Sequence, residues 1–214
     1  MARSLEPQLS RVNLLMGVEP SDGLREAYIT LSSLYRRRGI AGVHALVQYA
    51  MAVYLYKMGY DIQVEKLLGR GLRADIYGEA PWGSVIVEVE TGFIPHNFIL
   101  YGEAYIKART SYKILNYSTL AEEFYIAIPA STNPAILLPR WALKEPARRG
   151  PEDLAEARRL LESFYPGHDS LADNIWEARL DGIYTVSFNG SKIDITELSP
   201  SSLGHREPPT LYII

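Results

Sequence analysis

A run of seven residues, Ser84–Glu90 (SVIVEVE), constrains the fold of this 214-residue chain more than any other stretch. Its valines and isoleucine are typical of a buried β-strand, yet Glu88 and Glu90 interrupt the apolar pattern. Side chains alternate along a strand, so both glutamates point to one side and the valines point to the other. An ionised carboxylate is costly to bury unless a cation or hydrogen-bond donors meet it. The run therefore predicts a strand with one core side and one acidic side, on which a site opens near the carboxyl end.

A third acidic residue, Asp75, lies in the preceding apolar run, Leu72–Tyr77. If the two runs are antiparallel neighbours joined by a turn at Glu79–Gly83, Asp75 lies beside Glu88. Converging carboxylates make a hard, oxygen-rich site that suits Mg²⁺ or Mn²⁺. The alternative is that these carboxylates line a solvated face and pair with lysine or arginine.

The rest of the pattern places these strands in an α/β fold. Helical spacing predicts helices at about 24–38, 43–58, 100–117 and 151–164. Strand patterns are found at Tyr60–Leu68, at the strongly apolar Glu123–Pro129, and in a hairpin over Gly182–Leu198 that turns at Asn189-Gly190. Residues 1–20 show no clear period and are expected to form a loosely attached arm.

This order predicts an α/β sandwich with a mixed sheet, in a single domain of residues 1–214. Within it we expect an N-terminal arm and helix at 1–42, a core at 43–130, and a C-terminal helix and hairpin elaboration at 131–214.

Composition and charge exclude several classes of protein. The net charge of −3 argues against coating nucleic acid through bulk charge, so such contacts must come from local basic clusters, at 36–38, 140–149 and 158–159. The absence of cysteine excludes disulfide scaffolds and thiolate metal sites. No secretory leader or membrane-spanning stretch is visible, so a cytoplasmic protein without membrane contact is expected.

The element order and the motifs around Asp75 and Glu88 resemble the PD-(D/E)XK nuclease superfamily, which includes restriction enzymes, archaeal Holliday junction resolvases and RecB-type nuclease domains. The resemblance covers about His44–Pro129 and implies a restriction-endonuclease-like core of helix, three-stranded meander, helix and strand. Arg73-Ala-Asp75 supplies its Asp motif and Glu88-Val-Glu90 its acidic motif.

The resemblance implies that Asp75, Glu88 and Glu90 bind Mg²⁺ or Mn²⁺, and that a metal-activated water hydrolyses DNA phosphodiester bonds. Glu90 stands where the family has its lysine, so the catalytic cation must come from elsewhere. Two cations share a face of the expected third helix, and we assign Lys113 to catalysis and Arg109 to clamping phosphate.

Two further residues are candidates for the substrate-binding side of the site. Gln48 occupies the position in the first core helix where family members often carry a glutamate, and it can still hold a metal-bound water. Arg73 flanks the Asp motif.

The missing motif lysine leaves a second hypothesis open: a catalytically inactive nuclease-fold protein that acts as a nucleic-acid-binding or assembly module. A third hypothesis is a metal-dependent hydrolase for another substrate, because a carboxylate cluster does not by itself determine which bond is hydrolysed. DNA is the expected partner, RNA is not excluded, and a homodimer is possible.

Overall fold

The computed structural model describes residues 4–19, 22–38, 40–69 and 71–203. Its centre is a six-stranded mixed sheet in which the strands follow the order of the chain. The strands are β1 (Asp61–Gly69), β2 (Leu72–Ala80), β3 (Gly83–Val89), β4 (Glu123–Pro129), β5 (Gly182–Phe188) and β6 (Ile193–Leu198). Strands β1 to β3 form an antiparallel meander, β4 is parallel to both β3 and β5, and β6 is antiparallel to β5. The predicted α/β class, mixed sheet and central parallel strand are confirmed.

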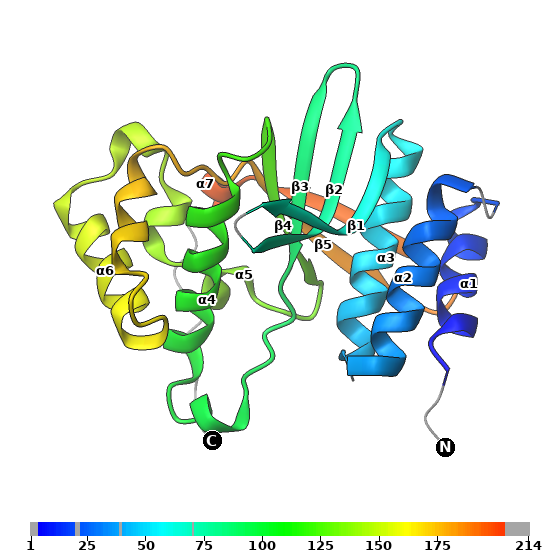
Figure 1. The fold of residues 1–214 in the computed structure, drawn as a ribbon, viewed down its shortest axis with the longest axis horizontal. Helices are drawn as coiled ribbons and strands as arrows, with labels where there is room; N and C mark the ends of the chain where they lie inside the picture. The colour runs from blue at the N-terminus through cyan, green and yellow to red at the C-terminus, as the bar shows by residue number, and fades with distance from the viewer. Residues whose placement is uncertain (1–3, 20–21, 39, 70, 204–214) are drawn as a thin grey trace.

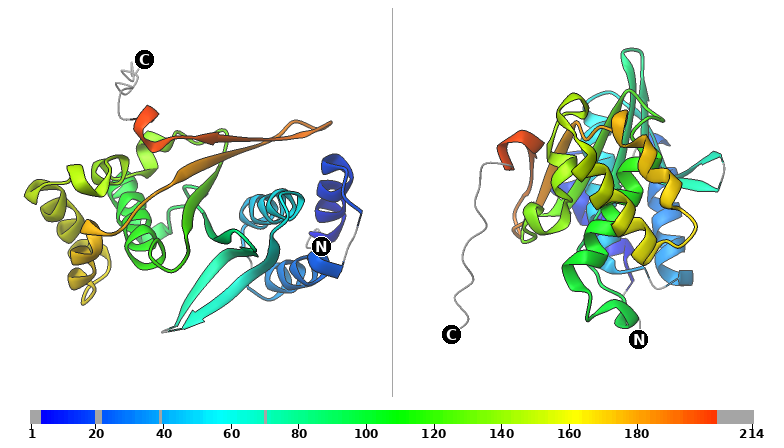
Figure 2. Two further views of the ribbon diagram at one scale, coloured as in Figure 1. Left: turned by 90° about the horizontal axis from the view of Figure 1, so that it is seen from above. Right: turned by 90° about the vertical axis from the view of Figure 1, so that its left-hand side faces the viewer.

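Helices cover both faces of this sheet, so the fold has three layers (Figure 1). One layer consists of α1 (Glu6–Met16), α2 (Asp22–Arg38) and α3 (Gly42–Lys57). The other layer consists mainly of α4 (Gly102–Tyr117) and α6 (Pro151–Phe164). Short helices complete the described chain: η1 (His96–Phe98), α5 (Pro134–Leu137), η2 (Arg140–Leu143), η3 (Pro146–Arg148), η4 (Asp169–Trp176) and α7 (Pro200–Leu203). Figure 2 shows the strong twist of the sheet, with the β1–β2 and β5–β6 hairpins at its two ends.

Strand β3 is buried on both sides, which argues against the alternative that its glutamates line a solvated face. Val85, Val87 and Val89 pack with the layer of α1–α3. On the other side Ile86 packs with apolar residues of α4 and α6. A central parallel strand covered by helices on both faces has no wet side. Glu88 and Glu90 are therefore interior residues, each only 2% exposed.

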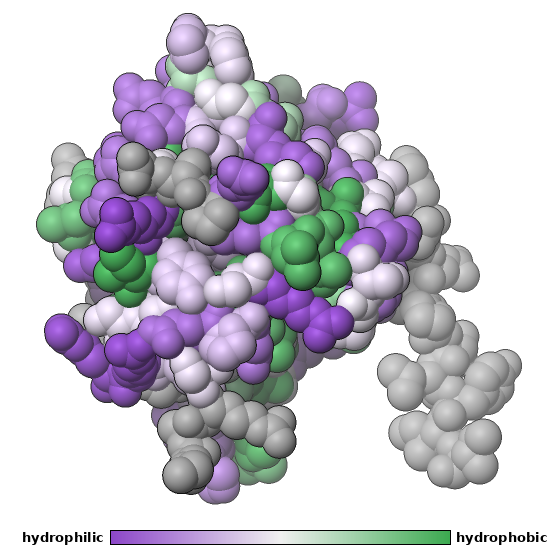
Figure 3. Space-filling model, turned by 90° about the vertical axis from the view of Figure 1, so that its right-hand side faces the viewer, coloured by the Kyte–Doolittle hydropathy of each residue, from purple (hydrophilic) through white to green (hydrophobic). Residues whose placement is uncertain are grey.

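The N-terminal segment forms a packed helix where we expected a loose arm. Leu9 and Val12 of α1 are buried against the α3 layer, and the Tyr49 hydroxyl donates a hydrogen bond to Asn13 at 3.0 Å. The apolar period is hidden in the sequence because Leu14 of the same helix is 78% exposed. A groove of about 800 Å³ separates α1 from α2, and Figure 3 shows apolar patches between polar side chains on the side of the molecule to which these helices belong.

The C-terminal part is partly described. The hairpin predicted at 182–198 is present, and its turn lies at the Asn189-Gly190 position. Residues 204–214 of the expected elaboration lie outside the described part of the chain. None of the helices in the described ranges is long and apolar enough to cross a membrane.

Candidate active site

Asp75 and Glu88 meet where β2 and β3 stop pairing. The last ladder pair is Ile76 with Val87. Beyond this pair, backbone N–H groups donate to side-chain carboxylates instead of to backbone carbonyls of the neighbouring strand. The Asp75 N–H donates to Glu88 Oε1 at 3.0 Å, and the Val89 N–H donates to Asp75 Oδ2 at 2.8 Å. The two acidic side chains therefore lie beside each other, as the antiparallel arrangement predicted.

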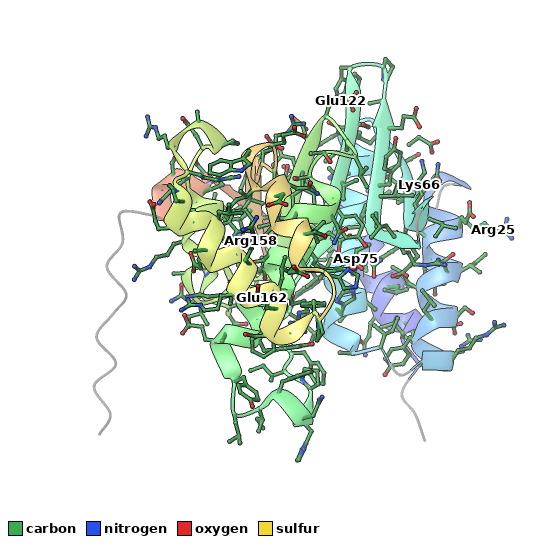
Figure 4. The ribbon with its side chains drawn as sticks, turned by 60° about the vertical axis from the view of Figure 1, so that its left-hand side comes forward. Arg25, Lys66, Asp75, Glu122, Arg158 and Glu162 are labelled. Atoms are coloured by element: carbon green, nitrogen blue, oxygen red, sulfur yellow. The ribbon has the colours of Figure 1, made fainter. Side chains whose placement is uncertain are left out.

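Lys113 of α4 reaches these carboxylates. Three oxygens surround its Nζ atom: Asp75 Oδ2 at 3.2 Å, Glu88 Oε2 at 3.0 Å and the Val89 carbonyl at 2.9 Å. We call these three atoms the oxygen cluster. An ammonium group has three donors, so the cluster satisfies all of them. Figure 4 places Asp75 between the N-terminal helices and the helices of the opposite layer.

The close charges shift the pKa of each member in a direction set by its surroundings. Burial raises the pKa of Glu88, and the neighbouring Asp75 charge raises it further, to about 8, although Lys113 works against this. Burial also opposes the charge of Asp75, but Lys113, His44 and the Val89 N–H together lower the pKa of Asp75 well below its ordinary value. Burial likewise disfavours the Lys113 ammonium, yet the surrounding carboxylates raise the pKa of Lys113 well above its ordinary value.

Glu90 lies apart from the oxygen cluster and is held by Arg109. The Arg109 Nε donates to Glu90 Oε2 at 2.7 Å, and Nη2 donates to Oε1, so the pair is bidentate. Glu90 Oε1 also accepts from the Gly92 N–H at 2.8 Å. Within the described ranges no three carboxylate or imidazole side chains are grouped to hold a metal. The expected trio of Asp75, Glu88 and Glu90 is therefore not assembled, and Arg109 is engaged by protein rather than free for phosphate.

Gln48 approaches the site from α3. Its Nε2 donates to the Asp75 carbonyl at 2.6 Å and to Glu65 Oε1 at 3.2 Å. Its Oε1 is buried and has no hydrogen-bond partner among the described residues. The sequence analysis predicted Gln48 at the site but did not predict Glu65.

Glu65 has a left-handed backbone conformation, with φ +55°, between two regularly paired residues of β1. The conformation is unfavourable for a residue with a side chain and persists where surrounding contacts fix it. One such contact comes from Arg73, whose Nη1 donates to the Glu65 carbonyl at 2.8 Å. Arg73, expected to bind substrate, thus supports the irregular strand beside the site.

His44 is a second site residue that the sequence analysis missed. Its Nε2 lies 3.6 Å from Asp75 Oδ1. His44 precedes Gln48 by one helical turn, so the two share a face of α3. That spacing is the signal by which it could have been found, but only after the face of α3 toward Asp75 is known.

A cavity of about 440 Å³ opens beside the oxygen cluster. Its wall is apolar at Ile40, Val89 and Phe93. Cationic groups of Arg109 and Lys113 lie on another part of the wall. Glu90 also lines the cavity and neutralises Arg109, so the apolar surface lies beside paired charges rather than beside free cations.

The basic clusters expected to track a phosphate backbone are largely engaged within the protein. Lys144 donates to Asp153 at 2.7 Å, and Arg158 pairs with Asp173 at 2.6 Å. The Arg149 guanidinium donates to backbone carbonyls, including that of Trp141 at 3.1 Å, and its burial lowers the pKa of Arg149 to about 10. These side chains hold the C-terminal layer together.

Comparison with known proteins gives little further information. No protein-family profile matches the chain, and no curated protein matches it. Two solved structures are similar to it at 15% sequence identity. A protein of unknown function from Silicibacter pomeroyi has a TM-score of 0.32, and the match covers 70% of this chain and 66% of that one. Pyrococcus furiosus SfsA in complex with Ca²⁺ has a TM-score of 0.30, and the match covers 74% of this chain and 60% of that one.

The chain thus spans about two thirds or less of each solved chain that it matches. At these TM-scores neither likeness carries an argument about fold or function.

Proposed function

We propose that this chain is a metal-dependent nuclease with a PD-(D/E)XK type of core, which hydrolyses phosphodiester bonds in DNA. The observation that carries the proposal is the oxygen cluster: the buried carboxylate of Glu88, the partly buried carboxylate of Asp75 and a backbone carbonyl converge on one lysine nitrogen at the wall of a cavity. Buried, strongly perturbed ionisable groups beside a cavity are the usual mark of a functional site. The order of α3, β1–β3, α4 and β4 also matches the order that the resemblance implies.

The donor atoms of the oxygen cluster fit a hard divalent cation. Carboxylate and carbonyl oxygens are the protein ligands that Mg²⁺ and Mn²⁺ prefer. Asp75, Glu88 and the Val89 carbonyl would hold the ion, and Glu90 would join them only after exchanging Arg109. When bound, such an ion supplies Lewis-acid polarisation of a phosphoryl oxygen and lowers the pKa of a bound water.

The remaining residues would position and stabilise the phosphate. The Lys113 ammonium would turn from the carboxylates toward the phosphoryl oxygens, where it stabilises the charge that develops in the transition state. The buried Gln48 Oε1, which has no partner among the described residues, would accept a hydrogen bond from a water at the site. Arg109 would remain bound to Glu90 and hold the cavity wall.

A second candidate function is a non-catalytic nucleic-acid-binding module. The observation that favours it is charge compensation, because Lys113 already neutralises part of the oxygen cluster and Arg109 neutralises Glu90. RNA as substrate and a two-fold dimer stay predictions, which RNA oligonucleotides in the same cleavage assay and sedimentation of the protein would test.

The test combines cleavage with metal binding. Purified protein is incubated with Mg²⁺ or Mn²⁺ and single-stranded, duplex, flap and junction DNA, beside the variants Asp75→Ala and Glu88→Ala. We expect metal-dependent cleavage that both variants lose. Calorimetry with Mn²⁺ should show binding that Glu88→Gln abolishes.

Cleavage that persists undiminished in both variants would contradict the proposed site. Binding of nucleic acid with neither Mn²⁺ binding nor cleavage would favour the second candidate function.

A further inference from the structure

The segment that connects β3 to α4 (Figure 1) carries several exposed apolar side chains, and its first part lines the cavity. Four large side chains within residues 93–101 project into solvent: Phe93 (62% exposed), Ile99 (61%), Leu100 (93%) and Tyr101 (59%). We call these four residues the apolar rim. Single exposed apolar residues are common, but four large ones within nine residues of one connecting segment make that segment a candidate contact surface.

The apolar rim is held in a defined position next to the candidate catalytic residues. The segment begins just after Glu90 and ends where α4 begins, so its two ends are fixed by the elements that carry the site. Arg109 Nη1 donates to the Phe93 carbonyl at 2.8 Å. Within the segment Phe98 stacks on Tyr105 of α4, with ring centroids 4.5 Å apart.

The rim meets the cavity at Phe93, which lines it together with Glu90, Arg109 and Lys113. Arg109 is paired with Glu90, so in the proposed function the positive charge for a phosphate would come from Lys113 and from a metal ion held at the oxygen cluster. A ligand that spans the two must present flat apolar groups on one part and negative charge on another. A nucleic-acid strand combines both, because its bases stack on apolar surfaces while its phosphates seek cations.

We infer that the apolar rim binds unpaired nucleobases, so that the substrate of the neighbouring site is single-stranded or locally unpaired nucleic acid. This inference rests on the proposed nuclease function and names its substrate class. Bases in a duplex are stacked on each other and offer no free faces to side chains, whereas unpaired bases do. Duplex binding would instead depend on cations that contact the phosphate backbone, and several of the basic side chains expected for it are paired with carboxylates.

The experiment measures binding separately from cleavage. Fluorescence anisotropy measures the affinity of the protein for a labelled oligonucleotide, either single-stranded or annealed to its complement. The buffer contains Ca²⁺ in place of Mn²⁺ to limit cleavage. We expect the wild-type protein to bind the single strand at least about tenfold more tightly than the duplex. Phe93→Ser and Tyr101→Ser should each weaken single-strand binding about tenfold, and Phe93→Trp should preserve it.

The matched control is Leu14→Ser, which removes an equally exposed apolar side chain from α1, in the opposite helical layer. It should leave both affinities unchanged. Thermal melting confirms that each variant is folded, which is expected because the substituted side chains are exposed.

Equal affinity for single strand and duplex, or rim variants that bind like wild type, would overturn the inference. A concentration-dependent dimer in sedimentation that Leu100→Ser dissociates, with nucleic-acid binding unchanged, would also overturn it and assign the rim to contact between copies. The inferred substrate class and the proposed nuclease function fail on different results. Metal-dependent cleavage without a preference for single strands would contradict only the substrate class. Single-strand binding that depends on the rim, without any cleavage, would contradict only the nuclease function.

Discussion

Lys113 holds a position that no single local pattern of the sequence specifies. Helix α4 carries three cations, and Lys113 is the one whose ammonium enters the oxygen cluster. Lys107 of the same helix pairs instead with Glu103, one turn before it. The difference between these two lysines is the face of α4 on which each lies, and it gives a matched pair for testing the role of Lys113.

Replacing Lys113 with glutamine is expected to reduce metal-dependent cleavage by at least about 100-fold, because a charge that stabilises the transition state is lost. The metal-free protein should also unfold at lower temperature, since the buried Glu88 and the partly buried Asp75 would lose their cation. Cleavage kinetics and thermal melting measure the two effects. Lys107→Gln should change neither, and equal losses in both variants would contradict the role of Lys113.

Glu88 gives a pH dependence of stability in the absence of metal. Folding raises its pKa from 4.5 to about 8. A group whose pKa is raised by folding stabilises the folded state below its unfolded pKa, and this contribution is lost as the pH rises through the folded value. Asp75 behaves in the opposite sense: its pKa is lowered, so its contribution is lost only in acid, below its ordinary value of 3.8.

Between about pH 5 and pH 9 the wild-type protein should therefore lose stability relative to Glu88→Gln, which cannot ionise. One pKa unit corresponds to about 1.4 kcal/mol, so the difference at alkaline pH is expected to reach a few kcal/mol. Urea unfolding in the presence of a chelator measures it. Glu162→Gln, on the exposed side of α6 (Figure 4), is the control and should follow the wild type. A constant difference between wild type and Glu88→Gln across this range would refute the raised pKa.

At the scale of elements, the Glu90–Arg109 pair joins β3 to α4. Glu90 is 2% exposed, and Arg109 is also bound to the segment that connects the two elements. Removing one partner of a buried ion pair leaves the other charge unpaired, which costs far more than removing both.

Arg109→Ala is therefore expected to lower the free energy of unfolding by about 3–5 kcal/mol, and Arg109→Met combined with Glu90→Leu to recover most of the loss. Chemical denaturation of the single and double variants measures the coupling. The exposed pair of Arg158 and Asp173 is the control, for which Arg158→Ala should cost less than about 1 kcal/mol. A similar small cost at Arg109 would show that Glu90 is not held in the interior.

The elements that were predicted well are those specified by local pattern. The valine run of β3 and the Asn189-Gly190 turn lie within the sequence they shape, and the structure places both strand and hairpin within a residue or two of the prediction. Helix α1 was not predicted, because only the contact with α3 decides which of its apolar residues are buried.

The site was predicted only in part, because some of its features follow from the local sequence and others depend on tertiary contacts. The neighbouring positions of Asp75 and Glu88 follow from a short antiparallel connection. The burial of Glu88 does not, since it depends on packing against elements distant in the sequence, such as α4, whose Lys113 contacts Glu88. Glu65 could not be predicted at all, because its left-handed backbone conformation results from contacts among β1, β2 and α3.

At the scale of the whole molecule, the candidate site draws on both helical layers. Gln48 and His44 come from α3 on one side of the sheet, and Lys113 comes from α4 on the other. Asp75 contacts all three side chains, so binding of a ligand at Asp75 should stabilise helices in both layers.

Saturating Mn²⁺ is expected to stabilise the protein by about 2.7 kcal/mol at a concentration one hundred times its dissociation constant. Hydrogen exchange followed by mass spectrometry should then show slower exchange in α3 as well as in α4. Asp75→Asn, with the same metal concentration, should abolish the change in both helices. Slower exchange confined to one helix would contradict a site shared between the layers.

The left-handed conformation at Glu65 bears on the temperature up to which the site keeps its geometry. An unfavourable backbone geometry relaxes first when neighbouring contacts weaken, and Gln48 connects it directly to the Asp75 carbonyl. The backbone of strand β1 around Glu65, at the outer edge of the sheet, would then change conformation while the rest of the fold stays intact. Catalysis would accordingly cease at a temperature below that of cooperative melting.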